Sequence, residues 1–167
     1  LGSDSLAKYI CNPLINITTM LLIILSGIGF SVWYDVLGNI KKIRKKEIPG
    51  KWWFTRLRLH SKLAIVTTLI LLAVGTLLTF LLEYHNPDTI GHLNFGEKWM
   101  ASAFQSVTTR TAGYSTFSQA GMHEETRFLN ILLMFIGGSP GGTAGGVKTT
   151  TIAMLMLTCI AFVRGGQ

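Results

Sequence analysis

The sequence predicts an all-α membrane protein whose transmembrane helices are interrupted by irregular, glycine-containing backbone. Hydrophobic residues make up 49% of the 167 residues, and the mean hydropathy is +0.43. Only 14% of the residues are charged, whereas soluble domains carry about 25%. Two uncharged runs, Tyr9 to Tyr34 and Leu63 to Leu82, reach the length of about 20 residues that a helix needs to cross a bilayer.

The first uncharged run predicts one spanning helix, and we assign residues 1–36 to it. The run has 26 residues between Lys8 and Asp35. Pro13 suits the first helical turn, where a missing amide hydrogen costs little. Gly27 and Gly29 are small enough to let a neighbouring helix approach closely.

Residues 37–62 form a basic segment between the two runs. Anionic lipid, nucleic acid and a cytoplasmic regulator are possible partners for such a segment. Because both flanks are long enough to span a membrane, the positive-inside rule explains the segment most simply, and it disfavours nucleic acid. A docking role beside this topological one stays open. The segment holds nine basic residues opposed only by Glu47: Lys41, Lys42, Arg44, Lys45, Lys46, Lys51, Arg56, Arg58 and Lys62.

Residues 63–164 are expected to form one unit of helix, pore loop and helix. Leu63 to Leu82 is the second spanning run, which then leads outward into a linker from Tyr84 to Phe95. Gly96 to Val107 has apolar residues at spacings of three and four, which predicts a helix of about half the spanning length. A half-length helix followed at once by a polar loop is typical of a re-entrant pore helix with its filter loop.

The filter candidate is the loop of Thr111, Ala112, Gly113 and Tyr114. Small residues and a glycine allow backbone carbonyls to replace the water shell of a potassium ion. Irregular backbone at membrane depth requires a cavity or surrounding protein. Arg110 either points away from the pore and braces the loop by pairing with a carboxylate, or extends its charge to outer water.

The second irregular segment follows an apolar helix that begins near Glu124. Glu124 to Arg164 is too long for one span, so we expect two half-helices joined by an intramembrane loop. The loop residues are Gly137, Gly138, Ser139, Pro140, Gly141, Gly142, Thr143, Ala144, Gly145, Gly146 and Lys148.

Three interpretations of this glycine-rich loop compete. A phosphate-binding loop needs a preceding strand and Lys directly after its last glycine, but Val147 intervenes. A helix-dimerisation face would use the Gly138-x-x-x-Gly142 spacing, but Pro140 and six glycines disfavour a continuous helix. A gating loop below the filter fits better, with Lys148 repelling cations from the cavity when the loop is in place.

No constellation of residues indicates an enzyme. His60, His85, His92 and His123 are dispersed, and neither a nucleophile with its base nor paired carboxylates appear. Cys11 and Cys159 are expected to be buried, inert thiols rather than a disulfide. Because the chain starts without methionine, we expect it to be an internal piece of a longer polypeptide. A non-transporting helical scaffold and a nucleotide-using membrane protein remain as rival functions.

Two stretches, Ser106 to Tyr114 and Phe135 to Thr151, resemble the Trk/Ktr/HKT superfamily of potassium transporters, specifically its Ktr-type membrane subunit. Leu25 to Trp33 fits the same subunit. The resemblance covers the whole chain and implies the last helix of a second repeat plus all of a third, out of four repeats around one pore. Residues 111–114 would then form one quarter of the filter, and 137–148 the gating loop.

The resemblance also implies the setting of the protein. It implies potassium uptake through a multi-pass subunit of the plasma membrane, with potassium as the transported ion, sodium as a stimulating ion and no organic cofactor. The expected partners are the lipid bilayer, a second copy of the subunit and a cytoplasmic nucleotide-binding regulatory ring. The other three filter strands are missing from this sequence.

Overall fold

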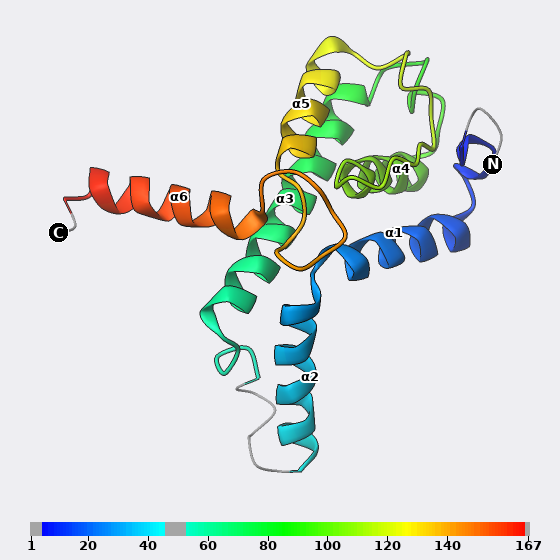
Figure 1. Ribbon diagram of the computed structural model, residues 1–167. Helices are drawn as coiled ribbons and strands as arrows, with labels where there is room; N and C mark the ends of the chain where they lie inside the picture. Colours follow the sequence, from blue (N-terminus) through cyan, green and yellow to red (C-terminus); the bar gives the residue numbers. More distant parts are fainter. Residues whose placement is uncertain (1–4, 46–52, 166–167) are drawn as a thin grey trace.

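The computed structural model describes residues 5–45 and 53–165, and the regular structure in these ranges is helical (Figure 1). A parallel bridge joins Ile136 and Val147. This confirms the predicted all-α class. The elements are η1 (Ala7–Tyr9), α1 (Pro13–Gly27), α2 (Phe30–Arg44), α3 (Leu59–Glu83), α4 (Phe95–Thr108), α5 (Glu124–Phe135) and α6 (Thr149–Val163).

The first apolar run is two helices rather than the one continuous helix that its composition predicted. Asn12 caps α1 by accepting hydrogen bonds from the amides of residues 14 and 15, with Pro13 in the first turn as expected. The chain then turns, and α1 and α2 are bent by 96° from one another. At the turn Gly29 adopts a φ of +89°, a left-handed conformation that a helix interior does not contain. We call residues Ser26 to Phe30 the corner.

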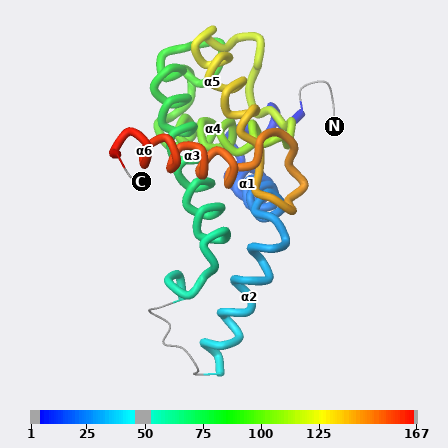
Figure 2. Tube along the Cα trace, turned by 60° about the vertical axis from the view of Figure 1, so that its left-hand side comes forward, coloured from blue at the N-terminus to red at the C-terminus, as the bar shows by residue number. Residues whose placement is uncertain are grey.

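Helix α3 is the central element of the molecule. It packs against α2, α4, α5 and α6, and Figure 2 shows it running through the middle of the fold. Its 25 residues form the one helix in the described residues that is long and apolar enough to cross a membrane alone. The bent α1–α2 pair passes the same test if it counts as one span.

Helix α4 matches the predicted short helix to within one residue at each end. A capping box starts it: the amide of Asn94 donates to Glu97 at 3.1 Å. Helix α4 also packs against the linkers that precede and follow it in the chain. The contact forms a small core of Ile90, Ala101, Phe117 and Met122. This packing fixes the direction in which α4 delivers the chain to the filter candidate.

The last segment divides into α5, an irregular loop and α6, as the length argument predicted. Helix α6 extends away from the body of the molecule (Figure 1). Only Thr149, Thr150 and Ala153 of α6 are buried, and large apolar side chains such as Leu155 and Phe162 are exposed. An apolar helix exposed on most of its surface is expected where lipid or further protein surrounds it.

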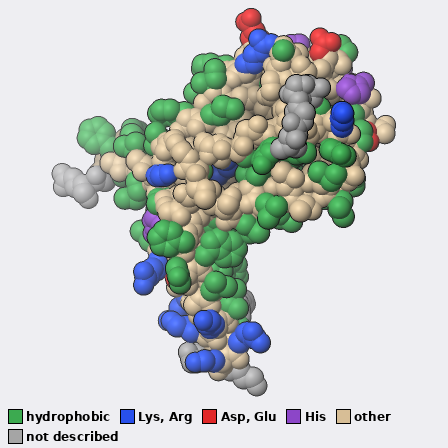
Figure 3. Space-filling model, turned by 45° about the vertical axis from the view of Figure 1, so that its right-hand side comes forward, with side chains coloured by type: hydrophobic (Ala, Val, Ile, Leu, Met, Phe, Trp, Pro, Cys, Tyr) green, Lys and Arg blue, Asp and Glu red, His purple; other side chains and the backbone are tan. Residues whose placement is uncertain are grey.

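Basic side chains gather at the end of α2 farthest from α4, where Figure 3 shows them in blue. Lys41, Lys42 and Arg44 occupy the last turn of α2 and are exposed. Cations there also complement the helix dipole. Lys46, Glu47 and Lys51 of the predicted basic segment lie outside the described residues.

Candidate functional site

The filter candidate follows α4 without a break, as a turn that reverses the chain. The amide of Ala112 donates to Thr108 O at 3.1 Å, and the Thr108 hydroxyl donates to the Tyr114 carbonyl at 2.6 Å. Gly113 has a φ of +78° and Thr111 a φ of +66°. A β-branched residue in this region costs about 1–3 kcal/mol and persists only where its surroundings hold it. Contacts with the rest of the protein therefore hold the loop in a backbone conformation that Thr111 would not favour by itself.

Side chains of α4 and its turn anchor the loop to α3 behind it. The Ser106 hydroxyl donates to Leu72 O at 3.0 Å, and Arg110 Nη2 donates to Thr68 O at 3.1 Å. The two acceptors lie one helical turn apart on α3. Gly75 makes this approach feasible, because a Cβ at that position would lie 2.4 Å from Ser106 Oγ. Two side-chain donors, Ser106 and Arg110, thus hold the filter candidate against α3.

The partner of Arg110 differs from both sequence-based expectations. The side chain is half-buried, so it does not extend freely to water. Its hydrogen bond in the described part of the chain goes to the backbone carbonyl of Thr68, not to a carboxylate. A guanidinium can brace a loop through a carbonyl because it offers five donors in a fixed plane. The sequence could not identify this acceptor, since every residue carries a carbonyl.

The glycine-rich loop closes on itself through backbone hydrogen bonds. The amide of Gly137 donates to Val147 O at 3.0 Å, and that of Val147 donates to Phe135 O at 2.9 Å. The buried hydroxyls of Ser139 and Thr149 lie 3.2 Å apart. A Cβ at Gly137 would lie 1.6 Å from Gly145 O, so no other residue fits there. The loop is a compact structure and not a slack connection.

Lys148 lies at the end of this loop and turns back into it. Its Nζ donates to Ala144 O at 2.8 Å, and the residue is half-buried. The charge is therefore held within the loop. Because helix α5 precedes the loop, the strand that a phosphate-binding loop requires is not there.

The two irregular segments meet in the structure. The amide of Gly145 donates to the hydroxyl Oγ1 of Thr111 at 3.2 Å. The segments are 34 residues apart in sequence, and the loop passes beside the α3–α4 pair in Figure 1. Of the predicted filter residues, Thr111, Gly113 and Tyr114 are exposed and Ala112 is half-buried. The filter candidate is therefore largely exposed where it borders the glycine-rich loop.

Two features of the site were missed by sequence reasoning. One is the corner between α1 and α2, which contacts the glycine-rich loop. The other is Glu83, a fully buried carboxylate at the end of α3. It accepts hydrogen bonds from Asn86 Nδ2 at 2.6 Å, Thr89 Oγ1 at 2.6 Å and the amide of His123 at 3.0 Å. Glu83 thereby ties α3 to the linker and to the start of α5. The sequence feature that could have identified Glu83 is its position as a single acidic residue directly after an apolar run.

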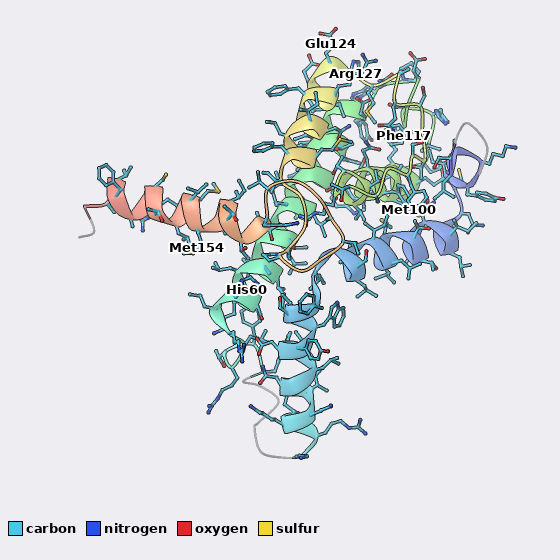
Figure 4. The ribbon with its side chains drawn as sticks, viewed as in Figure 1. His60, Met100, Phe117, Glu124, Arg127 and Met154 are labelled. Atoms are coloured by element: carbon cyan, nitrogen blue, oxygen red, sulfur yellow. The ribbon has the colours of Figure 1, made fainter. Side chains whose placement is uncertain are left out.

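Two recesses in the described part of the chain lie along α3. One lies between α3 and α6, where His60 and Met154 are labelled in Figure 4. Another follows α1, α3 and α4 and includes Leu21, Leu72 and Trp99. Within residues 5–45 and 53–165, no group of three or more His, Cys, Asp or Glu residues could hold a metal ion.

Comparison with known proteins defines the class and then the family. Residues 1–167 match the family model TrkH, described as a cation transport protein. The chain belongs to this family, whose members are membrane transport proteins rather than enzymes. It is 40% identical over 165 residues to the Ktr system potassium uptake protein B of Bacillus subtilis (strain 168), and 36% identical over 164 residues to that of Vibrio alginolyticus.

The family match extends to other uptake proteins and to the fold. The chain is 37% identical over 164 residues to the potassium/sodium uptake protein NtpJ of Enterococcus hirae. These three alignments cover 97–99% of the chain but 33–34% of each relative, so the chain spans about a third of their length. The crystal structure of the potassium transporter TrkH from Vibrio parahaemolyticus matches with a TM-score of 0.73 at 19% identity, covering 98% of this chain and 32% of that one.

Proposed function

We propose that this chain supplies one of the four filter strands, and the gating loop beside it, of a potassium uptake protein in the plasma membrane. In the full-length protein, carbonyls of residues 111–114 would replace part of the water shell of potassium. The hydrogen bond between the Gly145 amide and the Thr111 hydroxyl supports this proposal most strongly, because it joins the two segments. The relatives named as potassium uptake proteins support the choice of ion.

The glycine-rich loop would obstruct the ion path in one position and clear it in another. Its closure through backbone bonds supports movement as a unit, since its ends meet at Gly137 and Val147. Lys148 would add electrostatic repulsion of cations while the loop is in place. The two donors to α3, Ser106 and Arg110, would hold the filter still while the loop moves.

The multi-pass topology and the partners belong to the same proposal. The full-length protein would span the bilayer several times, with the basic end of α2 on the cytoplasmic side. It would form a homodimer and bind a cytoplasmic ring that senses nucleotides. Sodium would act as a stimulating ion, whereas the relative named as a potassium/sodium uptake protein supports sodium as an ion that is taken up.

Potassium uptake by the full-length parent tests the proposal, in a strain lacking its own uptake systems. We expect the parent to restore growth at low potassium. We expect Gly113→Ser to lose the preference for potassium over sodium, because its φ of +78° disfavours any side chain. Gly96→Ser is the matched control, since a Cβ at Gly96 meets nothing within 4 Å. A parent that takes up no potassium, or a Gly113→Ser variant with unchanged preference, would refute the proposal.

A further inference from the structure

The corner between α1 and α2 is bonded to the glycine-rich loop through backbone atoms. The amide of Ser139 donates to Gly27 O at 3.0 Å, and that of Thr143 donates to Ser26 O at 3.5 Å. In the opposite direction the amide of Phe30 donates to Gly141 O at 3.2 Å. The carbonyls of residues 26 and 27 have no amide partner further along α1, because the helix ends there. Amides of the loop therefore supply the hydrogen-bond donors that these two carbonyls lack within α1.

The two backbones approach so closely that glycine is needed on both sides. A Cβ at Gly29 would lie 2.4 Å from Pro140 O and 3.1 Å from the Gly142 amide nitrogen. On the loop side, a Cβ at Gly142 would lie 2.8 Å from Gly27 O. A Cβ at Gly141 would meet the Phe30 ring at 2.8 Å. The fit is specific, because Gly27 and Gly38 in the same two helices have no atom within 4 Å of such a Cβ.

The contact joins two distant parts of the molecule. One side of the loop touches the corner through residues 139–143, and the next residues reach the filter candidate through Gly145 and Thr111. From the corner, α2 continues to the basic end with Lys41, Lys42 and Arg44 (Figures 1 and 3). A displacement of α2 therefore has a direct covalent and hydrogen-bonded route to the loop.

We propose that the corner positions the glycine-rich loop, with Gly29 as the positioning residue, and that α2 transmits movement from its basic end to this loop. The inference rests on the proposed gating function of the loop and adds what holds the loop in place. Three backbone hydrogen bonds and the close packing of glycines together hold the corner to the loop. Separating the two breaks several contacts at once, which suits a two-position gate.

Substitution at the corner gives the first test. In Gly29→Ala the added methyl group collides with Pro140 O and disfavours the φ of +89°. We expect the loop to be released and potassium flux into proteoliposomes of the full-length protein to rise about five-fold, as for a population shift from mostly blocked to mostly clear. The preference for potassium over sodium should stay, because the filter is not altered. Gly38→Ala, outside the corner, is the matched control and should behave as the parent does.

A reversible cross-link gives the second test and does not depend on tolerance of Gly29→Ala. Ser26→Cys and Thr143→Cys are combined in a full-length background without other cysteines, Cys11 and Cys159 included. We expect oxidation to link the corner to the loop and lower the flux, and reduction to restore it. Each single cysteine variant is the control for oxidation itself.

The outcomes separate this inference from the proposed function. If the parent transports potassium but the cross-link does not form, or forms and leaves the flux unchanged, the corner does not position the loop. Gly29→Ala with the flux of Gly38→Ala would overturn the inference in the same way. If the parent itself carries no potassium, the proposed function fails first.

Discussion

The filter candidate and the glycine-rich loop touch one another, yet they are held by different means. The first is anchored by side chains, since Ser106 and Arg110 donate to carbonyls of α3. The second is held largely by backbone groups, which pair within the loop and with the corner. A segment fixed by side chains tolerates changes that keep the donor. A segment fixed by backbone contact is sensitive to an atom added at that contact but indifferent to most side-chain chemistry.

In the proposed function, this difference separates the static filter from the movable loop. The α3 carbonyls that accept from Ser106 and Arg110 belong to a continuous 25-residue helix. The carbonyls that accept from the Ser139 and Thr143 amides of the loop belong to the end of α1, where the helix is already broken. A loop held at a break moves more readily than one held along an intact helix, because less regular structure must change.

The largest effect is expected where the loop has no free space. Gly137→Ala places a methyl group 1.6 Å from Gly145 O, and neither backbone can yield without opening the loop. We expect a loss of about 2 kcal/mol or more in the free energy of unfolding. Thermal unfolding of the purified full-length protein measures it.

The matched control lies in the same loop. At Gly145 the nearest atom to an added Cβ is Thr111 Cγ2 at 4.0 Å, so Gly145→Ala should leave stability near that of the parent. Equal stability of the two variants would show that the loop is not closed as described.

A smaller effect is expected at the side-chain anchor of the filter. Arg110→Gln removes the charged donor to Thr68 O, and a hydrogen bond from a charged group is worth about 1.5–3 kcal/mol. We expect a measurable loss of potassium preference, read from competing potassium and sodium fluxes. Arg164→Gln, at the exposed end of α6, controls for the loss of a positive charge. An unchanged ion preference in Arg110→Gln would rule out bracing.

The smallest effect is expected at Lys148. Lys148→Met keeps much of the side-chain length but removes the charge and the bond to Ala144 O. We expect potassium flux to rise by about two-fold, since repulsion from one partly solvated charge is worth less than 1 kcal/mol. Flux measured at low and at high ionic strength tests the electrostatic cause, because salt should reduce the difference. A flux equal to that of the parent would leave Lys148 as an anchor of the loop only.

Patterns that are local in sequence led to correct predictions. The spacing of Trp99, Met100, Ala103 and Phe104 located α4, and the acids at 124 and 125 marked the start of α5. Length alone indicated that Glu124 to Arg164 contains a break, and glycine and proline located it. Such features depend on propensity and periodicity, which act within a few residues.

Partners far apart in sequence were not predictable in the same way. The first apolar run has the composition of one helix, and Gly27 and Gly29 were interpreted as sites of helix packing. The corner instead forms because the loop near residues 139–143 supplies partners for its free backbone groups. The carbonyl that accepts from Arg110 and the donors around Glu83 are likewise set by packing.

The sequence by itself determined the chemical type of each segment: apolar helices, a basic end, a short helix with a polar turn, and a glycine-rich loop. Hydropathy, charge and glycine content fix these properties wherever the segments come to lie. Only the tertiary structure decided that the loop binds the corner on one side and Thr111 on the other. Backbone groups are alike in every residue, so their pairing follows from shape and distance in the folded chain and not from residue identity.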